Sequence, residues 1–202
     1  MAEPPDDLEL IVINGRVAHL KKRLHADASL AARRGLVALA ALTGEYGTVE
    51  MLLAHGASAD DDASDDQIGD ETALAFGHRS RHLEHMHALD FACLRADIGL
   101  VRLLLEHGAR IGAEHLQLAG SVAADHPGDP TWARCSEQCV AVLADAKRRR
   151  ARRRLRAAIA SVAALRAWHA RAAERAYAPD GAGYLQAEQD FARRLRVGDV
   201  GR

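Results

Sequence analysis

The sequence predicts an all-α protein in which helical hairpins stack into an α-solenoid, followed by a basic helical extension. Of 202 residues, 49% are apolar but only 4% are aromatic, a balance that favours packed helices over sheets. Residues 35–57 and 87–109 match each other without gaps. Residues 1–146 hold 12 Lys and Arg against 23 Asp and Glu, whereas residues 147–202 hold 15 against 5. We therefore expect two segments of opposite charge.

The chain begins with a polar stretch, residues 1–7, that we expect to be disordered. The segment Ile11 to Ala26 follows and has the pattern of a worn N-terminal repeat or cap. Its apolar run from Leu8 to Ile13 is far shorter than the roughly 20 residues of a membrane span. The start also lacks the basic n-region of a secretory signal, and three cysteines are too few for a disulfide framework. We expect a cytoplasmic or nuclear protein with no membrane partner.

Each matching window has the pattern of a helix, a turn and a second helix. In the first window, Val37, Ala40 and Ala41 are spaced for one face of a short helix. Gly44 is expected to end that helix, and Gly56 and Gly108 to close the second helices. The apolar stripes of those second helices are Val49, Leu52 and Leu53 in one window and Val101, Leu104 and Leu105 in the other. Neither hairpin hides its stripe alone, so the hairpins are expected to stack.

The windows also share their endings. Met51-Leu52-Leu53 corresponds to Leu103-Leu104-Leu105, and His55-Gly56-Ala57 to His107-Gly108-Ala109. With the small pair Ala40-Ala41, these residues resemble the ankyrin-repeat family. The resemblance implies a non-catalytic repeat domain over residues 8–146 that binds another protein as a scaffold or adaptor.

The family pattern opens each repeat with Thr-Pro-Leu-His, and this sequence departs from it. Gly35-Leu36 and His87-Ala88 stand at the Thr-Pro positions, and Ala38 and Asp90 at the His position. We therefore expect weaker hydrogen bonds at the starts of these helices.

An insertion separates the two windows, because equivalent positions lie 52 residues apart and the family period is about 33. It runs over about residues 58–86 and begins with Asp60-Asp61-Asp62. We expect a solvated, mobile loop there, since so acidic a run does not bury itself. Within it, Gly69 to Leu74 resembles the opening of a decayed repeat.

A fourth, degenerate repeat is expected from His115–Ala119 and Cys139–Leu143. Residues 125–132 hold two prolines and a glycine, so we expect a loop between its halves. Trp132 in this loop is a candidate contact, or it covers the end of the array.

The C-terminal segment, residues 147–202, is basic and expected to be helical. Leu155, Ile159, Val162, Leu165 and Trp168 form an apolar stripe on that helix, which we expect to dock on the end of the solenoid. Pro179 and Gly181–Gly183 should end the helix, with a short final helix over about 185–195.

The ankyrin resemblance implies binding through the hairpin tips and the exposed side of each first helix. Carried onto this sequence by position, the partner-binding residues are Leu42, Thr43, Ser58, Asp60, Leu94, Arg95, Arg110 and Gly112.

The basic segment supports an alternative function, a nuclear or nucleic-acid-associated regulator acting through residues 147–156. Its charges are Lys147, Arg148, Arg149, Arg150, Arg152, Arg153, Arg154 and Arg156. Such a run suits phosphate contacts or a nuclear-import signal. The default interpretation is a solvated helical face, which in part neutralises the acidic loop.

The sequence gives little support for catalysis or metal binding, and we expect no enzyme, cofactor or metal. His78, His82, His85 and His87 crowd one stretch, but without a ligand motif a metal site there stays a minor alternative. The sequence lacks phosphate-binding glycine motifs, a Gly-x-Ser-x-Gly elbow and a His-Glu-x-x-His helix. The mixture of clear and decayed repeats resembles ankyrin proteins of large DNA viruses and bacteria, which implies action in a host cell as one possibility.

Overall fold

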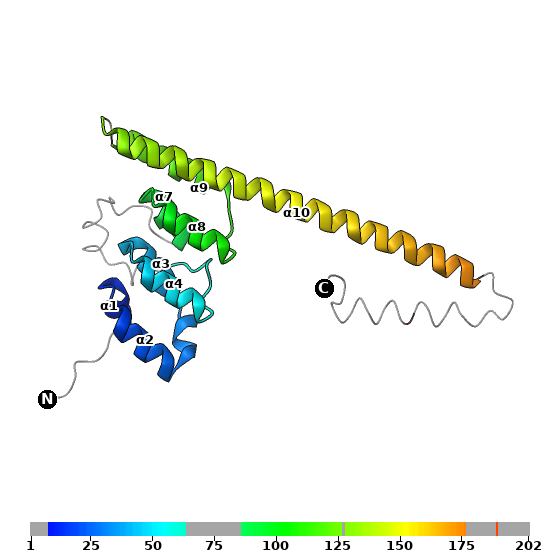
Figure 1. The fold of residues 1–202 in the computed structure, drawn as a ribbon, viewed down its shortest axis with the longest axis horizontal. Coiled ribbons are helices and arrows are strands. Elements are labelled where there is room, and N and C mark those ends of the chain that lie inside the picture. Colours follow the sequence, from blue (N-terminus) through cyan, green and yellow to red (C-terminus); the bar gives the residue numbers. More distant parts are fainter. Residues whose placement is uncertain (1–7, 64–85, 127, 177–188, 190–202) are drawn as a thin grey trace. The chain divides into compact units, whose positions relative to one another are not determined.

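A computed structural model describes residues 8–63, 86–126, 128–176 and 189 (Figure 1). The chain divides into two compact units, Met1–Lys147 and Arg148–Arg202, next to the expected boundary at 146/147. The only β pairing in the described ranges is an isolated bridge between Asp62 and His87, and the remaining regular structure is helical. The all-α prediction is confirmed. The expected disordered N-terminus, and all of the expected final helix except Gln189, lie outside the described residues.

The first hairpin consists of α1 (Leu8–Ile13) and α2 (Val17–Ala26), followed by the 3-10 helix η1 (Ala28–Ala32). The turn between them uses Asn14 and Gly15, where the apolar run stops, and the backbone N–H of Asn14 donates to the carbonyl of Leu10 at 3.1 Å. Asp27 caps η1 by accepting from the backbone N–H of Ser29 at 3.0 Å, and the hydrogen bonds from Ser29 lower the pKa of that carboxyl.

Both matching windows fold as hairpins. The first forms α3 (Leu36–Thr43) and α4 (Tyr46–Ala54), and the second forms α7 (Ala88–Leu94) and α8 (Ile98–Glu106). The same bond closes each turn: the N–H of Glu45 donates to Ala40 at 2.9 Å, and the N–H of Asp97 to Ala92 at 3.0 Å. The sequence match between the windows therefore corresponds to a match in backbone geometry.

The turn after each first helix requires a left-handed residue. Gly44 has this conformation with φ 80°, and ends α3 as predicted. At the equivalent position of the second window stands Ala96, with φ 49°. A side chain makes this conformation costly, so Ala96 is a point of local strain.

The helices of the first unit pack in two layers. The first helices contact one another in the order α1, α3, α7 and α9 (Ala113–Asp125), and the second helices in the order α2, α4 and α8. Seven of the eight residues of α3, Leu36 to Leu42, are buried. A helix enclosed in this way must be apolar on all sides, and α3 is accordingly built from Leu, Val and Ala up to its final Thr.

The last hairpin differs from the prediction. The expected loop over 125–132 is shorter, because α9 reaches Asp125 and α10 (Pro130–Ala176) already begins at Pro130. Proline is tolerated at the first helical position, where its missing N–H is not needed. Trp132 is half-buried and stacks on His126, with ring centroids 4.2 Å apart.

The helix α10 serves two roles along its length. Before residue 147, Cys139 and Leu143 are fully buried and belong to the hydrophobic core of the first unit. Beyond it, the four aliphatic residues of the expected stripe are exposed: Leu155 by 62%, Ile159 by 60%, Val162 by 51% and Leu165 by 44%. Docking of this stripe on the array stays a prediction. Among the described helices, none combines the length and the apolar character that crossing a bilayer would require.

Candidate protein-binding surface

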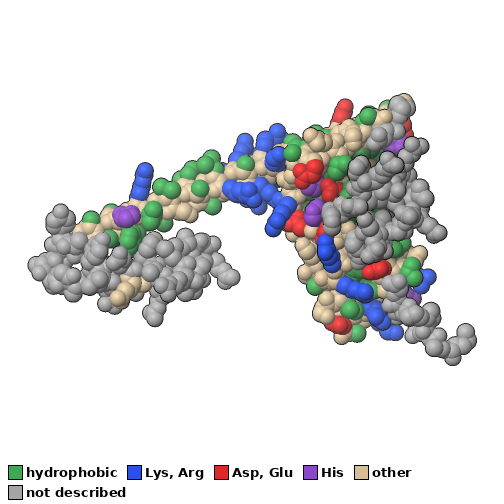
Figure 2. All heavy atoms as spheres, turned by 180° about the vertical axis from the view of Figure 1, so that it is seen from behind, with side chains coloured by type: hydrophobic (Ala, Val, Ile, Leu, Met, Phe, Trp, Pro, Cys, Tyr) green, Lys and Arg blue, Asp and Glu red, His purple; other side chains and the backbone are tan. Residues whose placement is uncertain are grey.

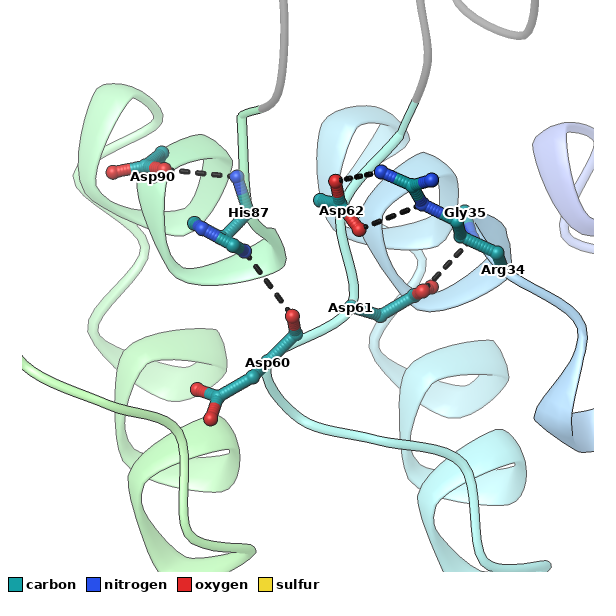
Figure 3. A network of polar contacts seen from close by, with 7 residues as sticks. All are labelled: Arg34, Gly35, Asp60, Asp61, Asp62, His87 and Asp90. Carbon is teal, nitrogen blue, oxygen red and sulfur yellow. Dashed lines mark hydrogen bonds and ion pairs between the residues drawn. The ribbon is translucent and has the colours of Figure 1, made fainter.

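Three loops meet at the starts of α3, α7 and α9, and Asp60, Asp61 and Asp62 join them. Figure 3 shows the part of this network that lies between α3 and α7. We call these three residues the acidic triplet. The sequence predicts a solvated, mobile loop here, and that prediction is wrong for residues 58–63. Each carboxylate of the triplet has partners from an adjacent loop, so the run is stabilised by neighbouring N–H and guanidinium donors. The rest of the expected insertion, residues 64–85, lies outside the described residues.

Asp61 is the central residue of the acidic triplet. Its Oδ1 accepts from the backbone N–H of Gly35 at 2.8 Å, and its Oδ2 from that of Val37 at 2.9 Å. Its backbone carbonyl accepts from the N–H of Ala88, at the first residue of α7, at 2.9 Å. One residue therefore satisfies backbone donors at the starts of both α3 and α7, where helices leave N–H groups unpaired.

Asp61 is 9% exposed, and burial raises the pKa of its carboxyl against the opposing effect of the backbone hydrogen bonds. A helix N-terminus also favours a negative charge. The carboxylate is thus a buried helix cap contributed by a residue 26 positions after Gly35.

The two flanking aspartates join the neighbouring loops. Asp62 forms a bidentate ion pair with Arg34, which lowers the pKa of the Asp62 carboxyl and raises the pKa of the Arg34 guanidinium. On the other side, Asp60 accepts from the backbone N–H of Arg110 and lies 3.1 Å from its Nε. Nδ1 of His87 lies 3.1 Å from the Asp60 carbonyl oxygen, a hydrogen-bond distance. These contacts hold three successive loops in one row.

The starts of α7 and α9 are capped from within their own first turns. Oδ2 of Asp90 accepts from the backbone N–H of His87 at 2.8 Å, and Nδ1 of His115 accepts from that of Gly112 at 2.9 Å. Because Nδ1 of His115 is an acceptor, the proton of its neutral ring lies on Nε2, 3.4 Å from Oδ1 of Asp90. Carboxylates therefore accept hydrogen bonds at the starts of both α3 and α7. Because charge-assisted hydrogen bonds are stronger than neutral ones, this geometry argues against the weak helix starts that the sequence led us to expect.

The predicted contacts on the first helices are mostly structural. Leu42 is 1% exposed, which corrects its assignment as a partner contact; its helix α3 packs against α1, α4 and α7. Thr43 is half-buried, and its hydroxyl donates within α3 to the Leu39 carbonyl at 3.2 Å and the Ala40 carbonyl at 3.1 Å. Leu94, at the position equivalent to Leu42, is half-buried and accessible in part.

Arg95 also has a structural role. Its Nη1 donates to the carbonyl of Leu42 at 3.2 Å, and its guanidinium lies over Gly44. A cation at a helix C-terminus interacts favourably with the helix dipole, so Arg95 links the end of α3 to the next hairpin.

The predicted loop residues remain at the surface. Ser58 and Arg110 each directly follow one of the two windows and are both exposed, whereas Asp60 and Gly112 are half-buried. The structure joins Asp60 to Arg110, and the N–H of Gly112 is used by His115. Sequence reasoning missed Arg34, Asp61 and Asp62 as members of this surface. A signal was present, since Asp61 and Asp62 lie five and six residues after Gly56, where the chain starts back towards the next helix.

The predicted basic segment lies on the surface of α10. Arg150 is half-buried, and the seven other basic residues of 147–156 are exposed. Asp60 and Asp62 pair instead with Arg110 and Arg34, so neither depends on the basic segment for a partner.

The histidines and cysteines show structural contacts. Nδ1 of His55 lies 2.9 Å from the Met51 carbonyl oxygen, and Nδ1 of His107 lies 3.0 Å from that of Leu103, in hydrogen-bonding geometry. His78, His82 and His85 lie outside the described residues. Within the described part, no group of three or more His, Cys, Asp or Glu side chains is placed to hold a metal ion.

Of the three cysteines, Cys93 and Cys139 are buried and Cys135 is half-buried. Burial raises the pKa of the Cys93 thiol, and raises that of Cys139 to about 11. Both thiols are therefore protonated at neutral pH and act as small core residues.

Comparison with known proteins identifies no relative. No protein-family model matches the chain, no curated protein matches it, and no solved structure matches it.

Proposed function

We propose that this chain is a non-catalytic, ankyrin-like repeat protein that binds another protein through the loops before α7 and α9. The observation that carries the proposal is the repetition of one hairpin, down to individual contacts. Glu45 and Asp97 make the same turn bond, and His55 and His107 make the same contact to the preceding turn of their helices. Stacked units of this kind form extended binding surfaces.

The acidic triplet supports a binding role for these loops because it fixes their shape before a partner arrives. Asp61 ties α3 to α7, and Asp60 ties the next loop through Arg110. Ordering a loop on binding costs free energy, so an ordered loop binds at a smaller cost. These loops present the exposed side chains of Ser58 and Arg110, and polar side chains of this kind form the rim of protein interfaces.

Site-specific photo-crosslinking tests this proposal with internal controls. A photoreactive amino acid placed at Ser58 or at Arg110 samples the loops. The same amino acid at Glu50 or Arg102, exposed and equivalent positions of α4 and α8, samples the second layer. In extracts of cells that naturally express the chain, we expect one discrete crosslinked protein from both loop positions and none from the control positions. The same product from all four positions, or no product from the loops, would overturn the proposal.

A further inference from the structure

The part of α10 after residue 148 combines two surface features, one charged and one apolar, that a single kind of partner could contact together. The first is a cluster of five arginines, which we call the arginine cluster: Arg150, Arg152, Arg153, Arg154 and Arg156. The second is the exposed apolar row: Leu155, Ile159, Val162 and Leu165. Figure 2 shows basic side chains gathered on this helix beside a stretch where hydrophobic side chains reach the surface.

The helix supplies the arginine cluster with no internal counter-charge. From Ala146 to Ala173 the sequence contains no Asp or Glu, so none of the five arginines has a carboxylate three or four positions away. Pairs at those spacings are the ones that stabilise an isolated helix, and like charges there destabilise it. Arginines this close to one another are stabilised by an external anion, and their planar guanidinium groups suit phosphate oxygens.

Four of the five arginines flank Leu155, the first residue of the exposed apolar row, and Arg153 lies on the opposite side of the helix. At about 100° per residue, Arg150 and Arg154 share one flank of α10. Arg152 and Arg156 share another flank, which lies about 160° away across the arc that contains Leu155. Ile159, Val162 and Leu165 continue within the same arc. The helix therefore presents an apolar face whose beginning, at Leu155, is bordered by cations on both sides, and residues 157–165 continue it without a Lys or Arg.

The exposure of the row decides between the partners that suit the cations. Duplex nucleic acid would neutralise the arginines but leave four aliphatic side chains, 44 to 62% exposed, in water. A second copy of the helix would cover the row but bring like charges together. A bilayer with anionic headgroups satisfies both, because the apolar face enters the headgroup boundary while the flanking arginines contact lipid phosphates.

We propose that residues 150–165 of α10 bind the surface of an anionic lipid bilayer, with the helix lying in the plane of the interface. This inference departs from the sequence expectation of no membrane partner, and the reason is the exposure of the row. It is independent of protein binding by the loops. The helix lies on the bilayer and does not cross it.

Co-flotation of the full-length protein with vesicles tests the inference. We expect binding to phosphatidylcholine vesicles that contain about 30% phosphatidylserine, little binding to pure phosphatidylcholine vesicles, and weakening as added salt screens the charges. Two variants test the apolar and the charged parts of the site separately. The double variant Ile159→Ala with Val162→Ala removes apolar contact and keeps the charge. A fourfold variant removes charge and keeps the row; its substitutions are Arg150→Gln, Arg152→Gln, Arg154→Gln and Arg156→Gln. We expect each to weaken binding at least tenfold.

A matched control variant removes the same number of positive charges, four, from the first unit. It replaces the exposed residues Arg16, Arg33, Arg102 and Arg134. Their replacement by Gln should change vesicle binding less than threefold. The inference is overturned if the wild type does not bind anionic vesicles, if the control weakens binding as much as the arginine-cluster variant, or if the Ile159/Val162 variant binds like the wild type. Binding of a 20-base-pair DNA duplex in place of vesicles would also overturn it and would favour the nucleic-acid alternative.

Far-UV circular dichroism verifies that each variant keeps its helix content, which Ala and Gln favour. A failure of vesicle binding leaves the photo-crosslinking result untouched, so the two proposals fail separately.

Discussion

Replacing Asp61 by alanine, and separately its half-buried neighbour Asp62, distinguishes a buried helix cap from an ion pair at the surface. The change removes both carboxylate oxygens from the N–H groups of Gly35 and Val37 but leaves the backbone bond to Ala88. Hydrogen bonds to charged groups contribute about 1.5 to 3 kcal/mol each, and the desolvation of Asp61 offsets part of two such bonds, so we expect a loss of about 2 to 4 kcal/mol.

The neighbouring substitution Asp62→Ala is the matched control. It breaks an ion pair whose arginine side chain is 65% exposed, and such exposed pairs contribute about 0 to 1 kcal/mol. Urea unfolding followed by circular dichroism at 222 nm measures both variants. With an m-value of about 2 kcal/mol/M, Asp61→Ala should lower the midpoint by about 1 to 2 M and Asp62→Ala by less than about 0.5 M. Equal shifts for the two variants would refute the assignment of Asp61 as the cap.

The pH dependence provides a second readout for Asp61. Burial raises its pKa above the ordinary value of 3.8, so the folded protein binds this proton more tightly than the unfolded chain does. Ionisation of Asp61 then lowers the free energy of unfolding as the pH rises from 3.8 through the raised pKa. The difference in free energy of unfolding between wild type and Asp61→Ala should therefore grow as the pH is lowered through that interval. A difference that shrinks on acidification would show that the hydrogen bonds outweigh burial.

Three further predictions concern two turn residues, Gly44 and Ala96, and the buried cysteine thiols. Gly44→Ala should destabilise the protein by at least about 1 kcal/mol, because φ is 80° and a left-handed residue with a side chain costs about 1 to 2 kcal/mol; the guanidinium of Arg95 must also move. Ala96→Gly, at the equivalent position, should change the unfolding free energy by less than about 1 kcal/mol, because relief of strain offsets added chain entropy; a loss as large as that of Gly44→Ala would contradict the strain at Ala96. Cys139, whose pKa is about 11, should have a thiolate fraction about a hundredfold below that of an ordinary thiol. Cys139 and Cys93 should therefore be alkylated by iodoacetamide at pH 8 much more slowly in the folded protein than in urea, and equal rates would refute their burial.

The helical hairpins were predictable from the sequence because their signals are local. The spacing of Val49, Leu52 and Leu53 requires only one helical turn of chain, and Gly44 ends α3 through its own backbone conformation. The boundary near residue 147 was equally visible, because charge composition changes there. The shorter last loop was missed because Pro130 was taken to interrupt a helix, whereas proline begins α10.

The candidate site was predictable only in part. Ser58 and Arg110 are exposed as expected, since residues just after a helix-closing glycine lie at the hairpin tip. The roles of Leu42 and Arg95 were not predictable, because each depends on how the hairpins stack. Leu42 is buried in the stacked array, and Arg95 donates to the carbonyl of Leu42, 53 residues away.

The sequence by itself therefore determined that this chain forms helical hairpins and a basic helix, since apolar spacing, turn residues and charge act over a few neighbouring positions. Only the tertiary structure decided what the acidic triplet does. An aspartate run in isolation is best solvated by water, and Asp61 becomes a buried cap only after stacking brings the start of α3 within hydrogen-bonding distance. The difference is physical: burial of a charge depends on donors that come from distant parts of the chain.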